Sequence, residues 1–179
     1  MAETGNELNQ YLSFLAAGEE YAISIVRVKE IIEFSTVTHV PAAAAAIRGV
    51  VNLRGCVVPL VDLAVRFGLP PTEVTKRSCV VIVELAMEGE SVVVGILCDA
   101  VSQVVDLPAG RIQPPPTFGT RAHAKFLSGM AEVGKKFVLI LDLDRTLENV
   151  DLIELAEAAP TEGEGSAAGM QAAAAGAAA

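Results

Sequence analysis

Apolar residues cluster along the chain in runs of strand length that are rich in valine and isoleucine. Such runs are typical of β-strands, because branched side chains pack well on a pleated and partly buried surface. Short glycine-containing segments at residues 17–19 and 88–90 separate neighbouring runs and are typical of hairpin turns. The pattern therefore predicts a mainly β protein, with strands at residues 11–15, 21–28, 57–61, 79–85, 92–97 and 137–141.

Helices are expected at only a few places. Asp62 and Asp142 each end an apolar run, and each is predicted to open a short helix. Apolar residues at helical spacing predict a C-terminal helix over residues 147–159. Residues 1–10 are expected to be a flexible N-terminus, and residues 160–179, which are rich in alanine and glycine, a disordered tail with almost nothing to bury.

An internal repeat organises the chain. Residues 21–32 resemble residues 94–105 at a constant offset of 73, and residues 47–50 and 57–63 resemble residues 127–130 and 137–143 at an offset of 80. Each unit contains enough strands to close a small five-stranded barrel. The predicted architecture is two packed five-stranded barrels in chain order, the first at residues 11–77 and the second at residues 78–146.

The repeat also helps to distinguish structural residues from functional ones. A residue that matches in both units is expected to have a structural role, because both units form the same turns and strands. Gly49 matches Gly129, and Asp62 matches Asp142. Both aspartates are therefore interpreted as helix N-caps rather than as a catalytic pair, and loss of either should cost about 1 kcal/mol of stability. Arg54 faces Gly134 in the second unit, so the barrel does not require its charge.

Composition and charge narrow the classes of partner. The 52% hydrophobic content is inflated by alanine, and no apolar run approaches the roughly 20 residues that span a bilayer. The N-terminus lacks the apolar core of a signal peptide, so we expect a cytoplasmic protein without membrane insertion. A net charge of -9 argues against nucleic acid. Five bases between residues 48 and 77, against two acids, suit an acidic protein partner.

The sequence offers no recognisable cofactor chemistry. Cys56, Cys79 and Cys98 form no CxxC pair, and they are expected to be buried small side chains in a reducing compartment. His39 and His123 have no partner at metal-ligand spacing. Neither a GxGxxG motif nor a Walker loop is present. We expect no metal and no cofactor.

Two charged residues fit a binding role better. Arg54 lies in the turn Asn-Leu-Arg-Gly at residues 52–55, where a guanidinium can face outward on a rigid hairpin. Glu30 is a charge inside an apolar run. Ordinary solvated side chains remain an alternative for both residues.

The string IRGVVNLRGCVVPLVDLAVRF at residues 47–67, together with residues 19–31 and 94–104, resembles CheW-type chemotaxis coupling proteins. The resemblance covers residues 11–158 and implies a CheW-like domain at residues 11–159. It implies two five-stranded SH3-like barrels, no enzymatic activity, and a cytoplasmic adaptor recruited to membrane-associated receptor arrays. The implied partners are methyl-accepting chemoreceptors and the regulatory domain of the histidine kinase CheA.

The resemblance also implies two sets of site residues. A receptor-binding groove between the barrels would involve Val28, Glu30, Arg54, Gly95, Val101 and Val104. A kinase-binding surface on the first barrel would involve Val37, Gly49, Leu53 and Val57. Two alternatives stay open: the same scaffold in a non-flagellar chemosensory pathway, and a small β-barrel enzyme or ligand-binding domain that uses Asp62, Asp142 or His39.

Overall fold

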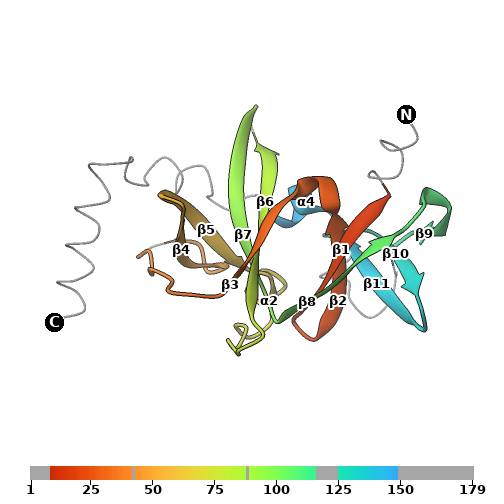
Figure 1. The fold of residues 1–179 in the computed structure, drawn as a ribbon, viewed down its shortest axis with the longest axis horizontal. Helices are drawn as coiled ribbons and strands as arrows, with labels where there is room; N and C mark the ends of the chain where they lie inside the picture. Colours follow the sequence, from red (N-terminus) through yellow and green to blue (C-terminus); the bar gives the residue numbers. More distant parts are fainter. Residues whose placement is uncertain (1–8, 42, 88, 116–124, 149–179) are drawn as a thin grey trace.

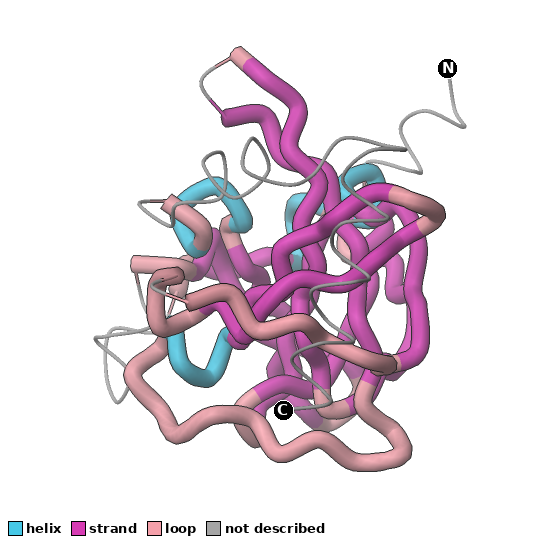
Figure 2. Tube along the Cα trace, turned by 90° about the vertical axis from the view of Figure 1, so that its left-hand side faces the viewer, coloured by secondary structure: helices cyan, strands magenta, loops and turns pink. Residues whose placement is uncertain are grey.

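The computed structural model describes residues 9–41, 43–87, 89–115 and 125–148, and these residues form two β-sheets. One sheet has the strand order β8-β1-β2-β11-β10-β9 and the other β3-β6-β7-β5-β4. The prediction of a mainly β protein is confirmed (Figures 1 and 2). The strands are β1 (Gln10–Ala16), β2 (Glu19–Ser24), β3 (Val28–Glu33), β4 (Ile47–Leu53), β5 (Cys56–Asp62), β6 (Cys79–Met87), β7 (Glu90–Cys98), β8 (Ala100–Asp106), β9 (Ile112–Gln113), β10 (Leu127–Val133) and β11 (Lys136–Leu141).

The two sheets repeat one topology. When the strand orders β3-β6-β7-β5-β4 and β8-β1-β2-β11-β10 are aligned, each strand of one sheet matches its repeat counterpart in the other sheet. For example, β3 matches β8, and β5 matches β11. Even the parallel pairs correspond, because Leu60 lies opposite Gly95 in one sheet and Ile140 opposite Ala22 in the other. The short β9 adds a sixth strand to the first sheet, where five were predicted. Its counterpart in the other sheet is a single bridge between Thr38 and Val50.

The barrels do not divide at residue 77 as predicted. The β1–β2 hairpin pairs with β8 and β11 from the second unit, while the β6–β7 hairpin pairs with β3 and β5 from the first. The units therefore exchange their first hairpins. The ranges 11–77 and 78–146 each contribute strands to both sheets, so neither range is a barrel.

The exchange follows from the segments that come after the hairpins. After β2 the chain makes one turn of 3₁₀ helix, η1 (Ile25–Arg27), and then runs as β3 into the other sheet. After β7 only Asp99 separates the strand from β8, which crosses in the opposite direction. Figure 1 shows β3 running toward β4 and β5, and β8 running back toward β10. These segments are too short and too extended to fold back onto their own hairpins.

A shared hydrophobic cluster joins the sheets. It contains Phe14 and Tyr21 from the β1–β2 hairpin, Val94 from β7, and Phe67 and Phe126 from the connections. The rings of Tyr21 and Phe67, and those of Phe67 and Phe126, each lie 5.5 Å apart. Two smaller clusters fill the separate barrels. The core therefore consists of three hydrophobic clusters, and the largest one contains residues of both units.

Both predicted helix caps are confirmed. Helices α2 (Leu63–Arg66) and α4 (Leu143–Thr146) begin after Asp62 and Asp142. The Asp62 carboxylate accepts a hydrogen bond from the Ala64 N–H, and the Asp142 carboxylate accepts one from the Arg145 N–H. Of the predicted C-terminal helix, residues 149–159 lie outside the described residues, as do the N-terminus up to residue 8 and the tail. No helix in the described part of the chain is long and apolar enough to span a bilayer.

The two aspartates nevertheless differ in a way that the repeat did not predict. Asp62 is fully buried and also accepts hydrogen bonds from the Thr72 N–H, the Thr72 hydroxyl and Arg48 Nη1. It therefore ties the connection after α2 to the barrel. Asp142 is partly exposed, and its side chain pairs with the exposed Arg145 one turn away. Asp62 is therefore a buried residue with several hydrogen-bond donors around it, whereas Asp142 is an ordinary helix cap.

We predict that Asp62→Ala lowers the free energy of unfolding by about 3 kcal/mol, because it removes one partner of a buried, hydrogen-bonded charge pair. Asp142→Ala should lower it by about 1 kcal/mol, the usual loss for a helix cap. Urea denaturation of the two variants beside the parent protein measures both values. Equal losses would show that the contacts to Thr72 and Arg48 add nothing to the cap.

Candidate functional site

The hairpin between β4 and β5 ends in a strained turn. Arg54 and Gly55 both have positive φ, 51° and 86°. The Asn52 side chain supports the turn by accepting the Gly55 N–H at 2.9 Å. A residue with a Cβ is disfavoured in this conformation by about 1 kcal/mol or more. The second unit has Gly134 at the corresponding position, with φ 64°, so the first unit carries an arginine where the backbone favours glycine.

Arg54 does not stand alone on the hairpin. Its Nη1 lies 3.3 Å from Oε2 of Glu30 on β3, which is the edge strand at the opposite end of the strand order from β4. Glu30 is 26% exposed and Arg54 is 79% exposed. One terminal nitrogen of an otherwise exposed guanidinium therefore pairs with a partly buried carboxylate. Two residues that the sequence analysis selected separately form one ion pair.

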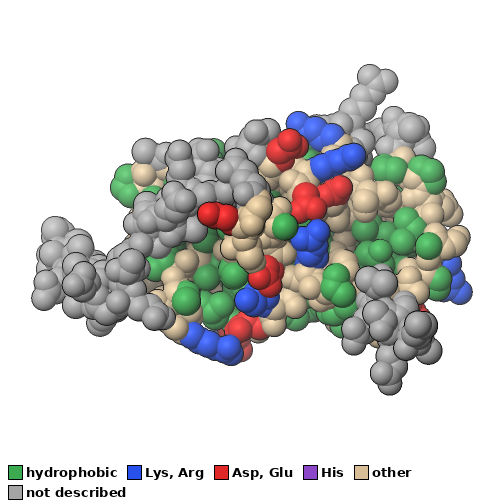
Figure 3. All heavy atoms as spheres, turned by 90° about the horizontal axis from the view of Figure 1, so that it is seen from above, with side chains coloured by type: hydrophobic (Ala, Val, Ile, Leu, Met, Phe, Trp, Pro, Cys, Tyr) green, Lys and Arg blue, Asp and Glu red, His purple; other side chains and the backbone are tan. Residues whose placement is uncertain are grey.

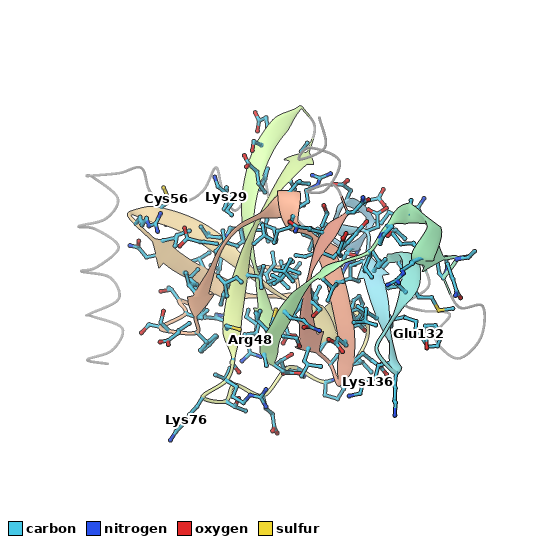
Figure 4. All side chains as sticks on the ribbon, turned by 45° about the vertical axis from the view of Figure 1, so that its right-hand side comes forward. Lys29, Arg48, Cys56, Lys76, Glu132 and Lys136 are labelled. Carbon is cyan, nitrogen blue, oxygen red and sulfur yellow. The ribbon has the colours of Figure 1, made fainter. Side chains whose placement is uncertain are left out.

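The pair lines a depression of about 370 Å³ on the sheet β3-β6-β7-β5-β4, with residues from both units. Its floor is apolar, with Val58, Ile82 and Val92, and its rim carries Lys29, Glu90 and the Arg54 hairpin. Figure 4 shows Lys29 and Cys56 beside one another at this end. Leu53 and Val57, predicted for the kinase, line the same depression as Glu30 and Arg54, predicted for the receptor. The two sets are thus neighbours rather than separate faces.

The remaining predicted receptor residues lie elsewhere. Val28 and Val101 are repeat counterparts, and both pack against the edge of the shared cluster. Val104, on β8, is 50% exposed. Gly95 is buried, and a Cβ there would come within 2.8 Å of Val80, so its role in the structure is close packing. None of these four residues lines the depression.

Val37 and Gly49, both predicted for the kinase surface, contact each other. A Cβ on Gly49 would lie 2.7 Å from a Val37 methyl and 2.2 Å from the Thr38 carbonyl oxygen. Gly129 meets Gln113 in the same way at 2.7 Å. Gly49 thus has a structural role, as the repeat predicted, because the backbone at Val37 and Thr38 passes directly over it.

The basic stretch at residues 48–77 does not form one basic patch. Arg48 is engaged with Asp62 and with the Thr72 carbonyl, and Arg54 with Glu30. Arg66 donates to the carbonyl oxygens of Thr146 and Glu148, at 2.6 and 2.7 Å. Figure 4 shows Arg48 and Lys76 well apart from Lys29. Figure 3 shows acids and bases interspersed across the middle of the face seen from above, between apolar areas.

The cysteines were predicted to be buried, and for Cys56 this is wrong. Cys56 is exposed because it is the first residue of β5, at the tip of the Arg54 hairpin, where no core lies beneath it. Cys98 is buried and Cys79 is partly buried. Burial raises the pKa of both of these thiols. Sequence reasoning missed Lys29, Glu90 and the exposed position of Cys56 in this depression, because only the sheet order β3-β6-β7-β5-β4 brings β3 and the β6–β7 hairpin to the β4–β5 hairpin.

Neither a metal centre nor a catalytic constellation appears among the described residues. No group of three His, Cys, Asp or Glu residues in that part of the chain could hold a metal ion. Asp62 is saturated by backbone and side-chain donors, and Asp142 caps α4. His39 is exposed, and His123 lies outside the described residues.

Two SH3-like β-barrels built from an internal repeat define the fold class of the protein. Residues 10–151 match the family model of the CheW-like domain. The chain therefore belongs to the CheW family, and it acts as an adaptor in chemotaxis signalling.

Individual relatives agree with this assignment. The chain is 32% identical to the chemotaxis protein CheW of Klebsiella aerogenes over 80% of its own length and 84% of the relative's. It is 33% identical to that of Bacillus subtilis over 64% and 69%. Among solved structures it resembles the scaffolding protein TtCheW of Thermoanaerobacter tengcongensis, with a TM-score of 0.68 and 32% identity over 78% of this chain and 88% of that one.

We predict that Arg54→Gly is about 1 kcal/mol more stable than Arg54→Ala, because both variants lose the Glu30 contact but only alanine keeps a Cβ in the left-handed conformation. Thermal or urea denaturation of the two proteins, side by side, measures the difference. Alanine at or above the stability of glycine would show that the turn is not strained at this position.

Proposed function

We propose that this chain is a non-catalytic adaptor that binds the cytoplasmic tip of methyl-accepting chemoreceptors and the regulatory domain of the kinase CheA at membrane-associated receptor arrays. The observation that carries the proposal is the ion pair of Arg54 and Glu30. It places a guanidinium, on a backbone that favours glycine, above an apolar depression. Membership of the CheW family supports the choice of partners.

The receptor surface in this proposal begins at the ion pair and continues onto the edge strands. Glu30 fixes the guanidinium, so less side-chain freedom is lost when Arg54 meets a carboxylate or a carbonyl group of the receptor. Val28 and Val101 follow along the seam between the barrels, and Val104 offers exposed apolar area. Gly95 supports this surface from below by allowing β7 to pack closely against β6.

The kinase surface in this proposal begins in the same depression, on the two strands of the β4–β5 hairpin. Leu53 and Val57 are partly exposed apolar residues on the two strands that flank the Arg54 turn. Val37 continues this surface, and the absence of a side chain at Gly49 lets the segment at Thr38 pair closely with β4. An apolar surface of this kind binds through burial rather than through charge. A change at Arg54 should therefore affect the kinase less than the receptor.

We predict that Arg54→Gly weakens binding of a receptor signalling fragment by about 1 to 3 kcal/mol, roughly 5- to 150-fold, because a charge-assisted contact is lost. Binding of the kinase regulatory domain should change by less than about threefold, since Leu53 and Val57 remain. Calorimetric titration of the same variant with each partner measures both affinities.

The matched control is Lys135→Gly, which removes one positive charge from the corresponding hairpin between β10 and β11. It should leave receptor binding within about twofold, as expected for an exposed charge outside the contact. If the two variants weakened receptor binding equally, the effect of Arg54 would be explained by net charge alone. Equal loss of both partners in Arg54→Gly would contradict the separate receptor and kinase surfaces.

A further inference from the structure

Two of the three cysteines face each other across a pair of neighbouring strands. Cys79 is the first residue of β6, and its register partner is Cys98, the last residue of β7. Residues directly opposite in an antiparallel pair point to the same face of the sheet. Both side chains accordingly pack against the shared cluster, Cys98 as a buried member and Cys79 at its edge. Cys56 lies on the distant tip of the β4–β5 hairpin.

The spacing of such partners suits a covalent bond. Opposed residues in antiparallel strands have Cα atoms about 4.5 to 5.5 Å apart, and disulfides form at Cα separations of about 4.4 to 6.8 Å. The thiols also influence each other electrostatically. Burial is the main cause that raises the pKa of Cys98, and the neighbouring Cys79 raises it further.

We propose that Cys79 and Cys98 form a cross-strand disulfide when the protein meets a hydroperoxide, and that this bond locks the β6–β7 hairpin where the chain crosses between the sheets. Cys79 is the more accessible thiol. Its thiolate attacks one peroxide oxygen, the O–O bond breaks, Cys79 becomes a sulfenic acid, and an alcohol or water is released. The Cys98 thiolate then attacks the Cys79 sulfur, and the sulfenic oxygen takes up a proton and leaves as water.

The position of the bond makes its consequence specific. Ser78, just before Cys79, accepts the Thr75 N–H and so ends the connection between the units. Asp99, just after Cys98, donates its N–H to Leu15 of β1 as the chain crosses to the other sheet. The bond therefore ties the segment that enters the exchanged hairpin to the segment that leaves it. A dithiol reductant restores the two free thiols.

The test uses Cys56→Ser, which removes the exposed thiol but leaves the proposed pair intact. After treatment with hydrogen peroxide, both remaining thiols should become unreactive together, and the mass should fall by two hydrogens. Peptide mapping without reduction should show one peptide linking residue 79 to residue 98, and dithiothreitol should reverse it. Hydrogen exchange of β6 and β7 should slow in the oxidised protein.

The control is Cys56→Ser combined with Cys98→Ser, in which Cys79 should accumulate a sulfenic acid that dimedone traps. Wild-type protein whose Cys56 has been alkylated first provides a second route that avoids the Cys56 substitution. Two free thiols after treatment that fully oxidises Cys56 in the wild type would overturn the proposal. So would over-oxidation of Cys79 without a linked peptide, or links only between different molecules.

Discussion

The hydrophobic cluster shared by the two sheets is the interaction on which the rest of the structure depends. It holds the neighbouring, mutually tilted rings of Phe14, Tyr21 and Phe67. The Tyr21 hydroxyl is buried there without a hydrogen-bond partner in the described structure, and burial raises its pKa to about 12. An unpaired phenol costs about 1 to 3 kcal/mol, whereas burying a tyrosine ring contributes about 4 to 6 kcal/mol at 25 cal/mol per Å². The free energy gained by burying the ring therefore exceeds the cost of the unpaired hydroxyl. Because the hairpins that supply this cluster are exchanged between the units, neither barrel closes without the other.

The binding surface follows from that arrangement. The crossing strand β3 brings Glu30 to the barrel that carries the β4–β5 hairpin, so that its carboxylate reaches Arg54. The same crossing packs Val28 against the shared cluster, which its repeat counterpart Val101 on β8 also contacts. On the far side, Arg66 of α2 binds the carbonyl of Thr146, its counterpart in α4. The pseudo-twofold relation thus fixes the scaffold, and the residues that break it, Arg54 above all, are free to serve recognition.

Much of the fold could be predicted from hydrophobic pattern and repeat, but the pairing of the units could not. A repeat shows that two units share a topology, and it is equally consistent with hairpins kept within a unit and with hairpins exchanged. Only the short connections at residues 25–27 and at Asp99 decide between them. Asp62 and Asp142 were correctly predicted as caps from their equivalent positions, yet the burial of Asp62 depends on Thr72 and Arg48, whose approach has no local signal. For the same reason the sequence selected Glu30 and Arg54 separately without predicting their contact. Cys56 was misplaced because valine-rich context does not distinguish a strand's interior from its end.

In the proposed function, one chain engages two partners at once through neighbouring surfaces on a single scaffold. This can be tested with a receptor signalling fragment immobilised on a sensor surface, over which the kinase regulatory domain is passed with and without this protein. We expect the kinase domain to be retained only when the protein is present, with a bound mass that corresponds to both components together. Displacement of the protein from the receptor by the kinase domain would contradict it, because the two surfaces would then be one.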